Sequence, residues 1–122
     1  MIYRPLVKAE MIKGKSAEYK KTFLDCVHSA LVEALGTEDW DRFQRINETP
    51  AENVELPEGK TEDFVIIELT IFPGRSREMK GKAIRLITEK LGRELGIAPT
   101  DIFIVINDPP LENWGMGGKQ KG

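Results

Sequence analysis

The residue with the clearest chemical potential is Arg75, which stands between Gly74 and Ser76 at the start of an amphipathic stretch. Ser76 is a typical N-cap residue, because its hydroxyl oxygen accepts hydrogen bonds from the backbone N–H groups of a first helical turn. A guanidinium beside such a cap can bind a carboxylate through two parallel hydrogen bonds, assisted by the N–H groups of the helix start. We therefore expect Arg75 to bind a small carboxylate. The other interpretation is a solvated arginine that merely precedes the helix.

The segment around Arg75 repeats a segment that lies sixty residues earlier. Residues 14–20 (GKSAEYK) match residues 74–80 (GRSREMK) in the glycine, the cation, the serine, the glutamate and the last lysine. The same spacing relates Leu35-Gly36 to Leu95-Gly96, Asp41 to Asp101, Phe43 to Phe103, Ile46-Asn47 to Ile106-Asn107, Pro50 to Pro110, and Glu52-Asn53 to Glu112-Asn113. The chain is therefore a duplicated unit. The shared glycine and serine serve a turn and a cap, which leaves the cation for function, and arginine suits a planar carboxylate better than Lys15 does.

Each half is predicted to form a strand, a helix and a strand. In the first half we expect a strand over residues 5–12, a helix between Ser16 and Gly36, and a strand over residues 41–46. In the second half we expect a strand over residues 64–72, a helix between Ser76 and Gly96, and a strand over residues 102–106. Apolar residues recur mostly every four positions in both helices, which indicates one buried face: Phe23, Val27, Leu31, Leu35, then Met79, Ala83, Ile87, Leu91 and Leu95. Prolines, glycine and acids over residues 47–61 predict a connecting loop.

These elements predict an α+β fold in one domain over residues 1–122, with internal halves at about 5–50 and 64–110. Right-handed crossovers place both helices on one face of a shared mixed sheet. A ferredoxin-like sandwich is one such fold, and periodicity does not separate it from other doubled β-α-β folds. The nearly continuous apolar run over residues 64–72 predicts burial on both faces. The sheet face without helices therefore needs a cover, which indicates association between copies.

Composition excludes several classes of function. The chain has 122 residues, 40% of them hydrophobic and 31% charged, which suits a single globular domain. Its 18 basic and 20 acidic residues leave a net charge of −2, so we expect no general attraction to nucleic acid or to anionic membranes. The first residues lack the apolar core of a signal peptide, and no apolar run is long enough to span a bilayer. We expect a cytoplasmic protein.

The residues that bind metals or cofactors in other proteins form no recognised pattern here. His28 has no second histidine or cysteine at metal-ligand spacing, which favours a structural role. Cys26, the single cysteine, is interpreted as a small buried apolar residue. The glycines near the C-terminus have neither phosphate-loop nor dinucleotide-binding spacing. We predict no metal and no cofactor.

Five segments together resemble the tautomerase superfamily, which has the fold of 4-oxalocrotonate tautomerase and macrophage migration inhibitory factor. They occur in the family order over nearly the whole chain, and they are Pro5-Leu6-Val7-Lys8, Gly14-Lys15-Ser16, Asp41-Arg42-Phe43-Gln44, Phe72-Pro73-Gly74-Arg75-Ser76 and Glu112-Asn113-Trp114. The branch that they resemble is that of malonate semialdehyde decarboxylase. The resemblance implies a homotrimer, in which three sheets enclose a core and the active sites lie near the subunit interfaces.

The resemblance implies that Pro5 is the catalytic base or proton donor. In this family the proline is amino-terminal and acts through its free secondary amine, which an apolar pocket near cations keeps neutral. Here Pro5 follows Arg4, so its nitrogen is an amide without useful basicity. Pro5 could act only if translation began later or if residues 1–4 were removed. Otherwise it is a proline that begins a strand.

The resemblance assigns roles to three further residues. Arg75 would hold the carboxylate of the substrate. Asp41 would orient a water or form a hydrogen bond with the proline, although its counterpart Asp101 also fits an aspartate that merely starts a strand. Trp114 would form an apolar wall of the substrate pocket, or else pack an interface. We therefore predict Pro5, Asp41 and Arg75 as catalytic residues and Arg75 and Trp114 as substrate-binding residues.

Three functions follow from these residues. The leading prediction is a small tautomerase that interconverts the keto and enol forms of a 2-oxo acid, with a small carboxylate as its substrate. The second is a decarboxylase or hydratase of a short 3-oxo acid, which Pro73 disfavours because the decarboxylase pattern carries a second arginine at that position. The third is a non-catalytic trimeric scaffold or anion-binding protein, in which the residues before Pro5 have abolished the base.

Overall fold

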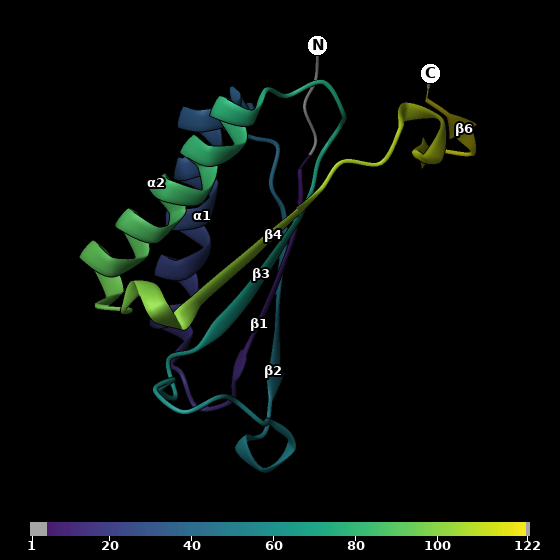
Figure 1. Cartoon of the computed structure of the whole chain (residues 1–122). Coiled ribbons are helices and arrows are strands. Elements are labelled where there is room, and N and C mark those ends of the chain that lie inside the picture. The colour runs from purple at the N-terminus through teal and green to yellow at the C-terminus, as the bar shows by residue number, and fades with distance from the viewer. Residues whose placement is uncertain (1–4, 122) are drawn as a thin grey trace.

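The computed structural model describes residues 5–121 and contains two long helices, a four-stranded sheet and a small C-terminal hairpin (Figure 1). In chain order the elements are β1 (Leu6–Ile12), α1 (Ala17–Leu35), β2 (Phe43–Thr49), β3 (Val65–Thr70), α2 (Arg77–Leu95), β4 (Ile102–Asn107), β5 (Gly115–Met116) and β6 (Lys119–Gln120). Short 3₁₀ turns lie at Ala51–Asn53 (η1), Pro99–Asp101 (η2) and Leu111–Asn113 (η3). The six predicted main elements are present. The ends of the strands shift by up to three residues because cross-strand pairing, which the sequence does not display, sets them.

The sheet has the strand order β2-β1-β3-β4. β1 pairs in parallel with β2, and β3 pairs in parallel with β4. The two halves of the chain meet through the antiparallel pair of β1 and β3. In a ferredoxin-like split β-α-β, a strand of one unit lies between the two strands of the other. Here the strands of each unit are neighbours, so the ferredoxin-like alternative is wrong and the duplicated β-α-β fold is confirmed.

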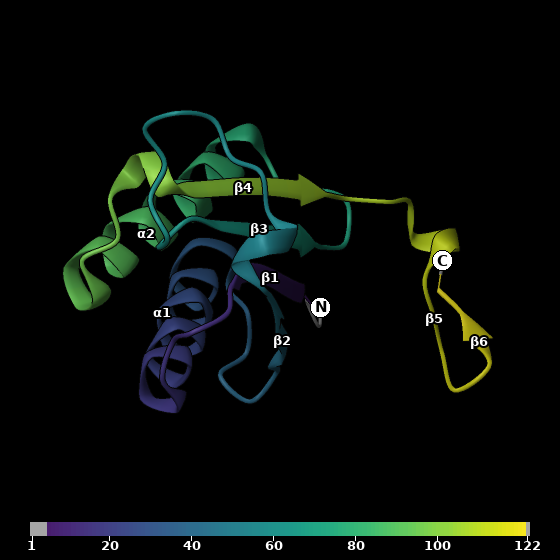
Figure 2. The same cartoon turned by 90° about the horizontal axis from the view of Figure 1, so that it is seen from below.

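Both helices lie side by side on one face of the sheet (Figures 1 and 2). Each begins after its predicted serine: Ser16 Oγ accepts from the Tyr19 N–H at 3.0 Å, and Ser76 Oγ accepts from the Met79 N–H at 3.2 Å. Each ends at its predicted glycine in the left-handed conformation. The buried core between the helices and the sheet takes the predicted helix residues Phe23, Val27, Leu31, Leu35, Ala83, Ile87 and Leu91, and the strand residues Val7, Ala9, Val65, Ile67 and Leu69.

The opposite face of the sheet has no helix over it. Strand residues alternate between the two faces, so β3 buries Val65, Ile67 and Leu69 against the helices while Ile66 points the other way and is 36% exposed. The prediction that this strand is buried on both faces is therefore wrong for the single chain. The same open face carries the exposed large hydrophobic residues Leu6, Phe43, Phe103 and Val105.

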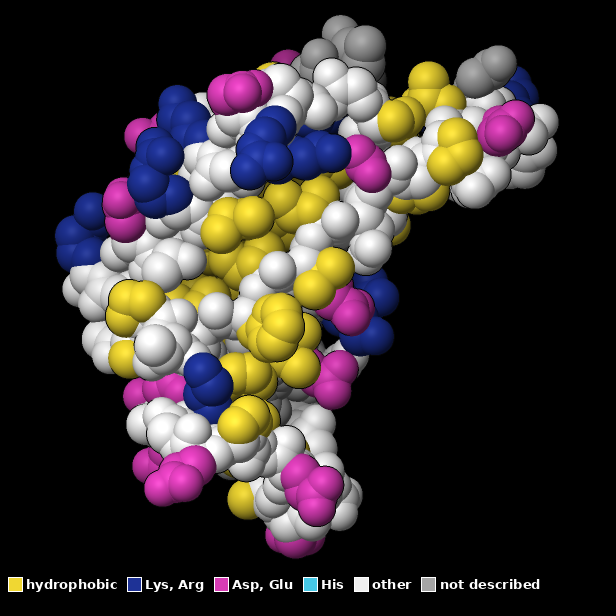
Figure 3. All heavy atoms as spheres, in the orientation of Figure 1, with side chains coloured by type: hydrophobic (Ala, Val, Ile, Leu, Met, Phe, Trp, Pro, Cys, Tyr) yellow, Lys and Arg dark blue, Asp and Glu magenta, His cyan; other side chains and the backbone are white. Residues whose placement is uncertain are grey.

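The chain after β4 leaves the body of the molecule. As predicted, Asp108-Pro109-Pro110 ends the last long strand. The segment beyond it runs away from the sheet and carries hydrophobic side chains (Figures 1 and 3). Figure 3 also shows hydrophobic side chains between α2 and β4, where the helical layer meets the sheet edge. Within residues 5–121, neither long helix is apolar enough to cross a bilayer.

Candidate active site

The fold brings three of the predicted site residues to one end of the sheet. Pro5 is buried directly before β1, and Asp41 is buried two residues before β2. Because β1 and β2 are parallel, with Leu6 opposite Phe43, these two residues lie at the same end. β3 runs antiparallel to β1, so the loop after β3, which carries Arg75, starts from that end as well. Met1–Arg4, whose presence makes the Pro5 nitrogen an amide, lie outside the described residues.

Asp41 is a buried carboxylate with unused hydrogen-bonding capacity. Its exposed fraction is 1%, and among residues 5–121 neither carboxylate oxygen has a hydrogen-bond partner. The buried hydroxyl of Thr37, in the same loop, is also without a partner among those residues. A buried carboxylate that makes no hydrogen bond is unfavourable for folding. Groups of this kind are enriched at functional sites, so Asp41 is a candidate acceptor or proton carrier.

Arg75 lies between the loop after β3 and the end of α1. Its Nη1 donates to the Phe72 carbonyl at 3.4 Å and its Nη2 donates to the Leu35 carbonyl at 3.5 Å. Leu35 is the last residue of α1, so the guanidinium faces the negative end of the helix dipole. Both distances are long for hydrogen bonds that a nitrogen donates to an oxygen.

Trp114 lines an apolar hollow at the same end of the sheet, on its open face. The hollow has a volume of about 100 Å³ and is lined by Leu6, Phe43, Phe72, Trp114, Gly115, Met116 and Lys121. The indole meets the Phe72 ring edge-on, with centroids 4.7 Å apart, and donates to the Pro109 carbonyl at 3.2 Å. Phe72 thus lies between the predicted wall and the predicted carboxylate binder, since its carbonyl bonds Arg75 and its ring meets Trp114.

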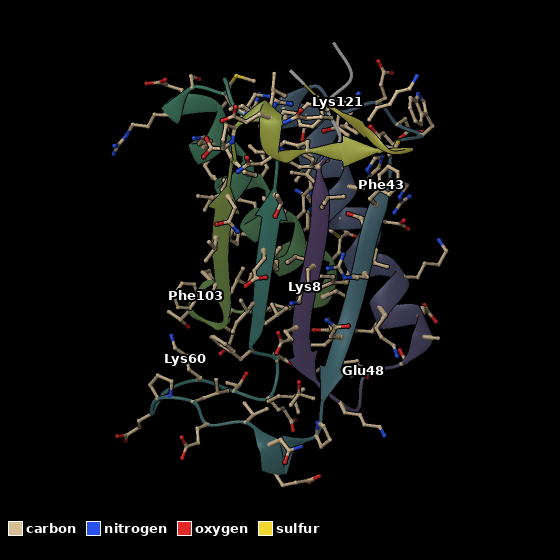
Figure 4. All side chains as sticks on the ribbon, turned by 90° about the vertical axis from the view of Figure 1, so that its right-hand side faces the viewer. Lys8, Phe43, Glu48, Lys60, Phe103 and Lys121 are labelled. Atoms are coloured by element: carbon tan, nitrogen blue, oxygen red, sulfur yellow. The ribbon has the colours of Figure 1, made fainter. Side chains whose placement is uncertain are left out.

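The sequence interpretation missed the hairpin that completes this hollow. Figure 4 shows β5 and β6 over the ends of β1 and β2, with Lys121 and Phe43 on the same side. Gly117 and Gly118 form its turn, and both have positive φ (63° and 78°). A type I′ hairpin turn requires positive φ at both of its central residues. The Gly-Gly dipeptide was therefore the signal that could have revealed the hairpin, and with it Met116 and Lys121.

The second half builds a counterpart of this site at the other end of the sheet. Asp101, the repeat partner of Asp41, is also buried, but it accepts from the Thr61 N–H at 2.9 Å and from the Thr61 hydroxyl at 2.6 Å. These hydrogen bonds hold the pKa of Asp101 below its ordinary value. Lys15, the counterpart of Arg75, forms an ion pair with Asp63, which raises the lysine pKa. Both groups are thus committed to structural partners.

The counterpart of the Trp114 hollow is also present. A groove of about 230 Å³ is lined by residues that include Ile12, Val54 and Leu56, which lie sixty positions before Phe72, Trp114 and Met116. It is also lined by Ile66, which lies sixty positions after Leu6. The equivalent of Trp114 is the smaller Val54, and the equivalent of Pro5 is Val65. This end of the sheet therefore also has a groove, but Val65 stands in place of Pro5 and Lys15 in place of Arg75.

His28 and Cys26 are buried on α1. The imidazole Nε2 of His28 lies 2.8 Å from the Asp39 carbonyl oxygen, and burial raises the pKa of the Cys26 thiol. No group of three or more histidine, cysteine or acidic residues that could hold a metal occurs within residues 5–121. Neither residue lines the hollow near Trp114.

The sequence comparisons identify the family. A family profile described as tautomerase enzyme matches residues 41–117, and a second profile with the same description matches residues 5–62. YrdN of Bacillus subtilis (strain 168), a probable tautomerase, is 32% identical over 118 residues, which are 93% of this chain and 91% of that protein. The chain belongs to the tautomerase family.

Solved structures agree with this assignment. Malonate semialdehyde decarboxylase, studied for its decarboxylase and hydratase activities, has a TM-score of 0.83 at 26% identity, over 92% of this chain and 90% of that one. A fused 4-OT solved as an asymmetric trimer has a TM-score of 0.84 at 24% identity, over 94% of each chain, which is a likeness of fold. The predicted membership in the tautomerase superfamily, in a branch that resembles malonate semialdehyde decarboxylase, is confirmed.

Proposed function

We propose that this protein catalyses the cofactor-independent interconversion of the keto and enol forms of a small 2-oxo acid, in a form whose Pro5 nitrogen is a free amine. The observation that carries the proposal is the buried Asp41 carboxylate, which has no partner among residues 5–121 and lies at the end of the sheet where Pro5 begins β1. No contact among residues 5–121 accounts for an acidic residue at this position, whereas a hydrogen bond from the Pro5 amine would.

Each group has one role in the reaction. Arg75 binds the carboxylate of the enol acid, and the hollow beside Trp114 takes its apolar part. The Pro5 amine accepts the proton of the enol hydroxyl and returns a proton to C3, so the double bond moves from C2–C3 to C2–O. Asp41 accepts a hydrogen bond from the amine and holds it toward C3. The number of protons is unchanged, so the step balances with the Pro5 amine as the only proton carrier.

The active form is proposed to be a homotrimer with a small carboxylate as substrate. The open sheet face carries Leu6, Phe43, Ile66, Phe103 and Val105, each at least 36% exposed in the single chain. These side chains lie in two groups, Leu6 with Phe43 and Ile66 with Phe103 and Val105, and the ion-paired Lys8 and Glu68 lie between them. A sheet face that exposes such apolar groups is a candidate surface for another subunit to cover. The fused 4-OT of the same fold was solved as a trimer. A stable monomer in sedimentation equilibrium would contradict this part of the proposal.

The test compares the full chain with protein that begins at Pro5. We expect ketonisation of phenylenolpyruvate by the shortened protein at least about 100-fold faster than by the full chain, the scale that general acid–base catalysis contributes. Arg75→Ala should abolish the gain by raising KM, whereas Lys15→Ala, the matched change in the other half, should leave it. Absence of activity in both proteins above the Arg75→Ala variant would refute the tautomerase proposal.

A second candidate reaction is decarboxylation or hydration of a short 3-oxo acid. The likeness to malonate semialdehyde decarboxylase favours it. Pro73 stands where the decarboxylase pattern has its second arginine, which disfavours it. Release of carbon dioxide from malonate semialdehyde by the shortened protein, without ketonisation, would select this reaction. Loss of both activities, with the trimer intact, would leave the non-catalytic anion-binding or scaffold role.

A further inference from the structure

The two equivalent aspartates of the repeat are anchored in different ways. Asp101 uses both carboxylate oxygens to bind Thr61, so the carboxylate itself ties η2 to the segment before β3. Asp41 makes no such bond within residues 5–121, although it is equally buried. The loop that carries Asp41 therefore needs another anchor, because a buried segment fixed only by its own backbone would move.

Helix α1 supplies that anchor on both sides of Asp41. The His28 ring lies 2.8 Å from the Asp39 carbonyl oxygen, two residues before the aspartate. Arg42, directly after it, donates to an Asp25 oxygen at 2.9 Å. Further along, the Gln44 amide donates to the Leu24 carbonyl at 3.0 Å. Within the loop itself, the Asp41 N–H bonds the Glu38 carbonyl at 3.0 Å and the Arg42 N–H bonds the Trp40 carbonyl at 3.1 Å.

Within residues 5–121, no side chain of helix α2 makes a hydrogen bond or ion pair with the loop that carries Asp101. Thr88 replaces His28, and its hydroxyl donates to the Ile84 carbonyl of its own helix at 2.9 Å. Ile102 and Ile104 replace Arg42 and Gln44 and carry no polar side-chain atom. In the first half, side chains of α1 and β2 hold the loop of Asp41, whose carboxylate has no partner within residues 5–121. In the second half, other residue types stand at those positions, and the Asp101 carboxylate itself holds the loop.

We infer that His28 is a positioning residue, which fixes the Asp41 loop through the Asp39 backbone and so leaves the Asp41 carboxylate available to accept a hydrogen bond from the Pro5 amine. His28 is 4% exposed, whereas the Arg42–Asp25 pair is exposed and screened by solvent, so the histidine contact is the better shielded of these two. A carbonyl oxygen only accepts, so Nε2 of His28 carries the hydrogen. This inference rests on the proposed function for its catalytic consequence, and on the hydrogen bonds above for its structural one.

The first measurement does not depend on catalysis. In the full chain, amide hydrogen exchange of Asp41 and Arg42 reports how firmly the loop is held. We expect His28→Leu, which keeps the volume and removes the donor, to raise both exchange rates at least about tenfold. His28→Gln keeps an N–H donor at similar reach and should restore most of the protection. Thr88→Val, the matched change on α2, should leave these two amides unchanged. Unchanged exchange in His28→Leu would overturn the inference.

The second measurement separates positioning from general stability. In protein beginning at Pro5, we expect His28→Leu to lower kcat about tenfold with KM within twofold, and His28→Gln to recover it. Loss of loop protection without any change in kcat would overturn the catalytic part of the inference. If no protein has ketonisation activity but His28→Leu still loosens the loop, the proposed function fails and the structural anchor stands.

Discussion

The two halves of this chain share a fold and differ in what their buried aspartates do. In the second half, Asp101 is bonded twice by Thr61 and closes its end of the sheet. In the first half, Asp41 keeps both oxygens unbonded within residues 5–121, and α1 holds its loop instead. The difference shows that two copies of one unit can hold the same buried group by different contacts. In one copy the carboxylate itself makes the hydrogen bonds, and in the other the neighbouring helix bonds the loop that carries it.

The largest expected effect tests whether the two halves share one core. Leu31 and Leu91 are repeat partners, 1% and 0% exposed. Leu31→Ala and Leu91→Ala should each lower the free energy of unfolding by about 3 kcal/mol, because each leaves a cavity in the same packed layer. Urea unfolding monitored by circular dichroism measures both. Values that differ by more than about 1.5 kcal/mol would show that the halves are not equivalent in packing.

The next prediction concerns the two buried aspartates, whose replacement by asparagine should change the free energy of unfolding in opposite directions. Asp101→Asn turns one acceptor into a donor that faces the donors of Thr61, and it should lower the free energy of unfolding by about 2 kcal/mol. Asp41→Asn replaces a buried carboxyl group that has no hydrogen bond within residues 5–121, and it should raise stability by about 1 kcal/mol while lowering activity. A loss of stability of similar size in both variants would contradict the functional assignment of Asp41.

A pH series sharpens the same comparison. The hydrogen bonds from Thr61 lower the pKa of Asp101 in the folded protein, so their stabilisation is present above the unfolded pKa of about 3.9 and is lost as pH falls through the folded value. Below about pH 4, wild-type stability should therefore decline more steeply than that of Asp101→Asn. Thermal unfolding from pH 7 to pH 2 tests this, with Thr61→Val as the variant that should behave in between.

The smallest effect concerns the exposed anchor of the Asp41 loop. Arg42 and Lys21 both donate to Asp25, which lowers the carboxyl pKa. Because these groups are largely solvated, Arg42→Ala should lower the free energy of unfolding by only about 0.5 kcal/mol, and 1 M salt should remove the difference. An effect larger than that of His28→Leu on the exchange of the Asp41 amide would move the anchoring role from the histidine to this pair.

Local signals in the sequence predicted much of this fold. The serine caps and glycine ends of both helices depend on hydrogen bonds within one turn, so Ser16, Gly36, Ser76 and Gly96 appear where expected. The end of β2 at Thr49 could not be predicted, because it is set by pairing with Ile12. The apolar run around Ile66 predicted burial on both faces, since the sequence does not distinguish a side covered by helices from a side left open in the single chain.

The candidate site could be predicted only in part, because its contacts join residues that are far apart in the sequence. The repeat and the family resemblance pointed to Asp41 and Arg75, whose placement follows from strand direction. The contacts that define their environments join residues from different elements, such as Arg75 with Leu35 and His28 with Asp39. No periodicity encodes such contacts. The roles of Pro5, Asp41, Arg75 and Trp114 stay predictions that the experiments above address.

The edge-on contact of Trp114 with Phe72 makes the intrinsic fluorescence of Trp114 a probe of ligand binding. The chain has two tryptophans, and Trp40 is 62% exposed whereas Trp114 is partly buried against an aromatic ring. Iodide should quench the emission of Trp40 and spare that of Trp114. The remaining emission then comes from the wall of the hollow, so a ligand that enters beside Met116 would shift its wavelength. Binding can thus be followed without a label and without turnover.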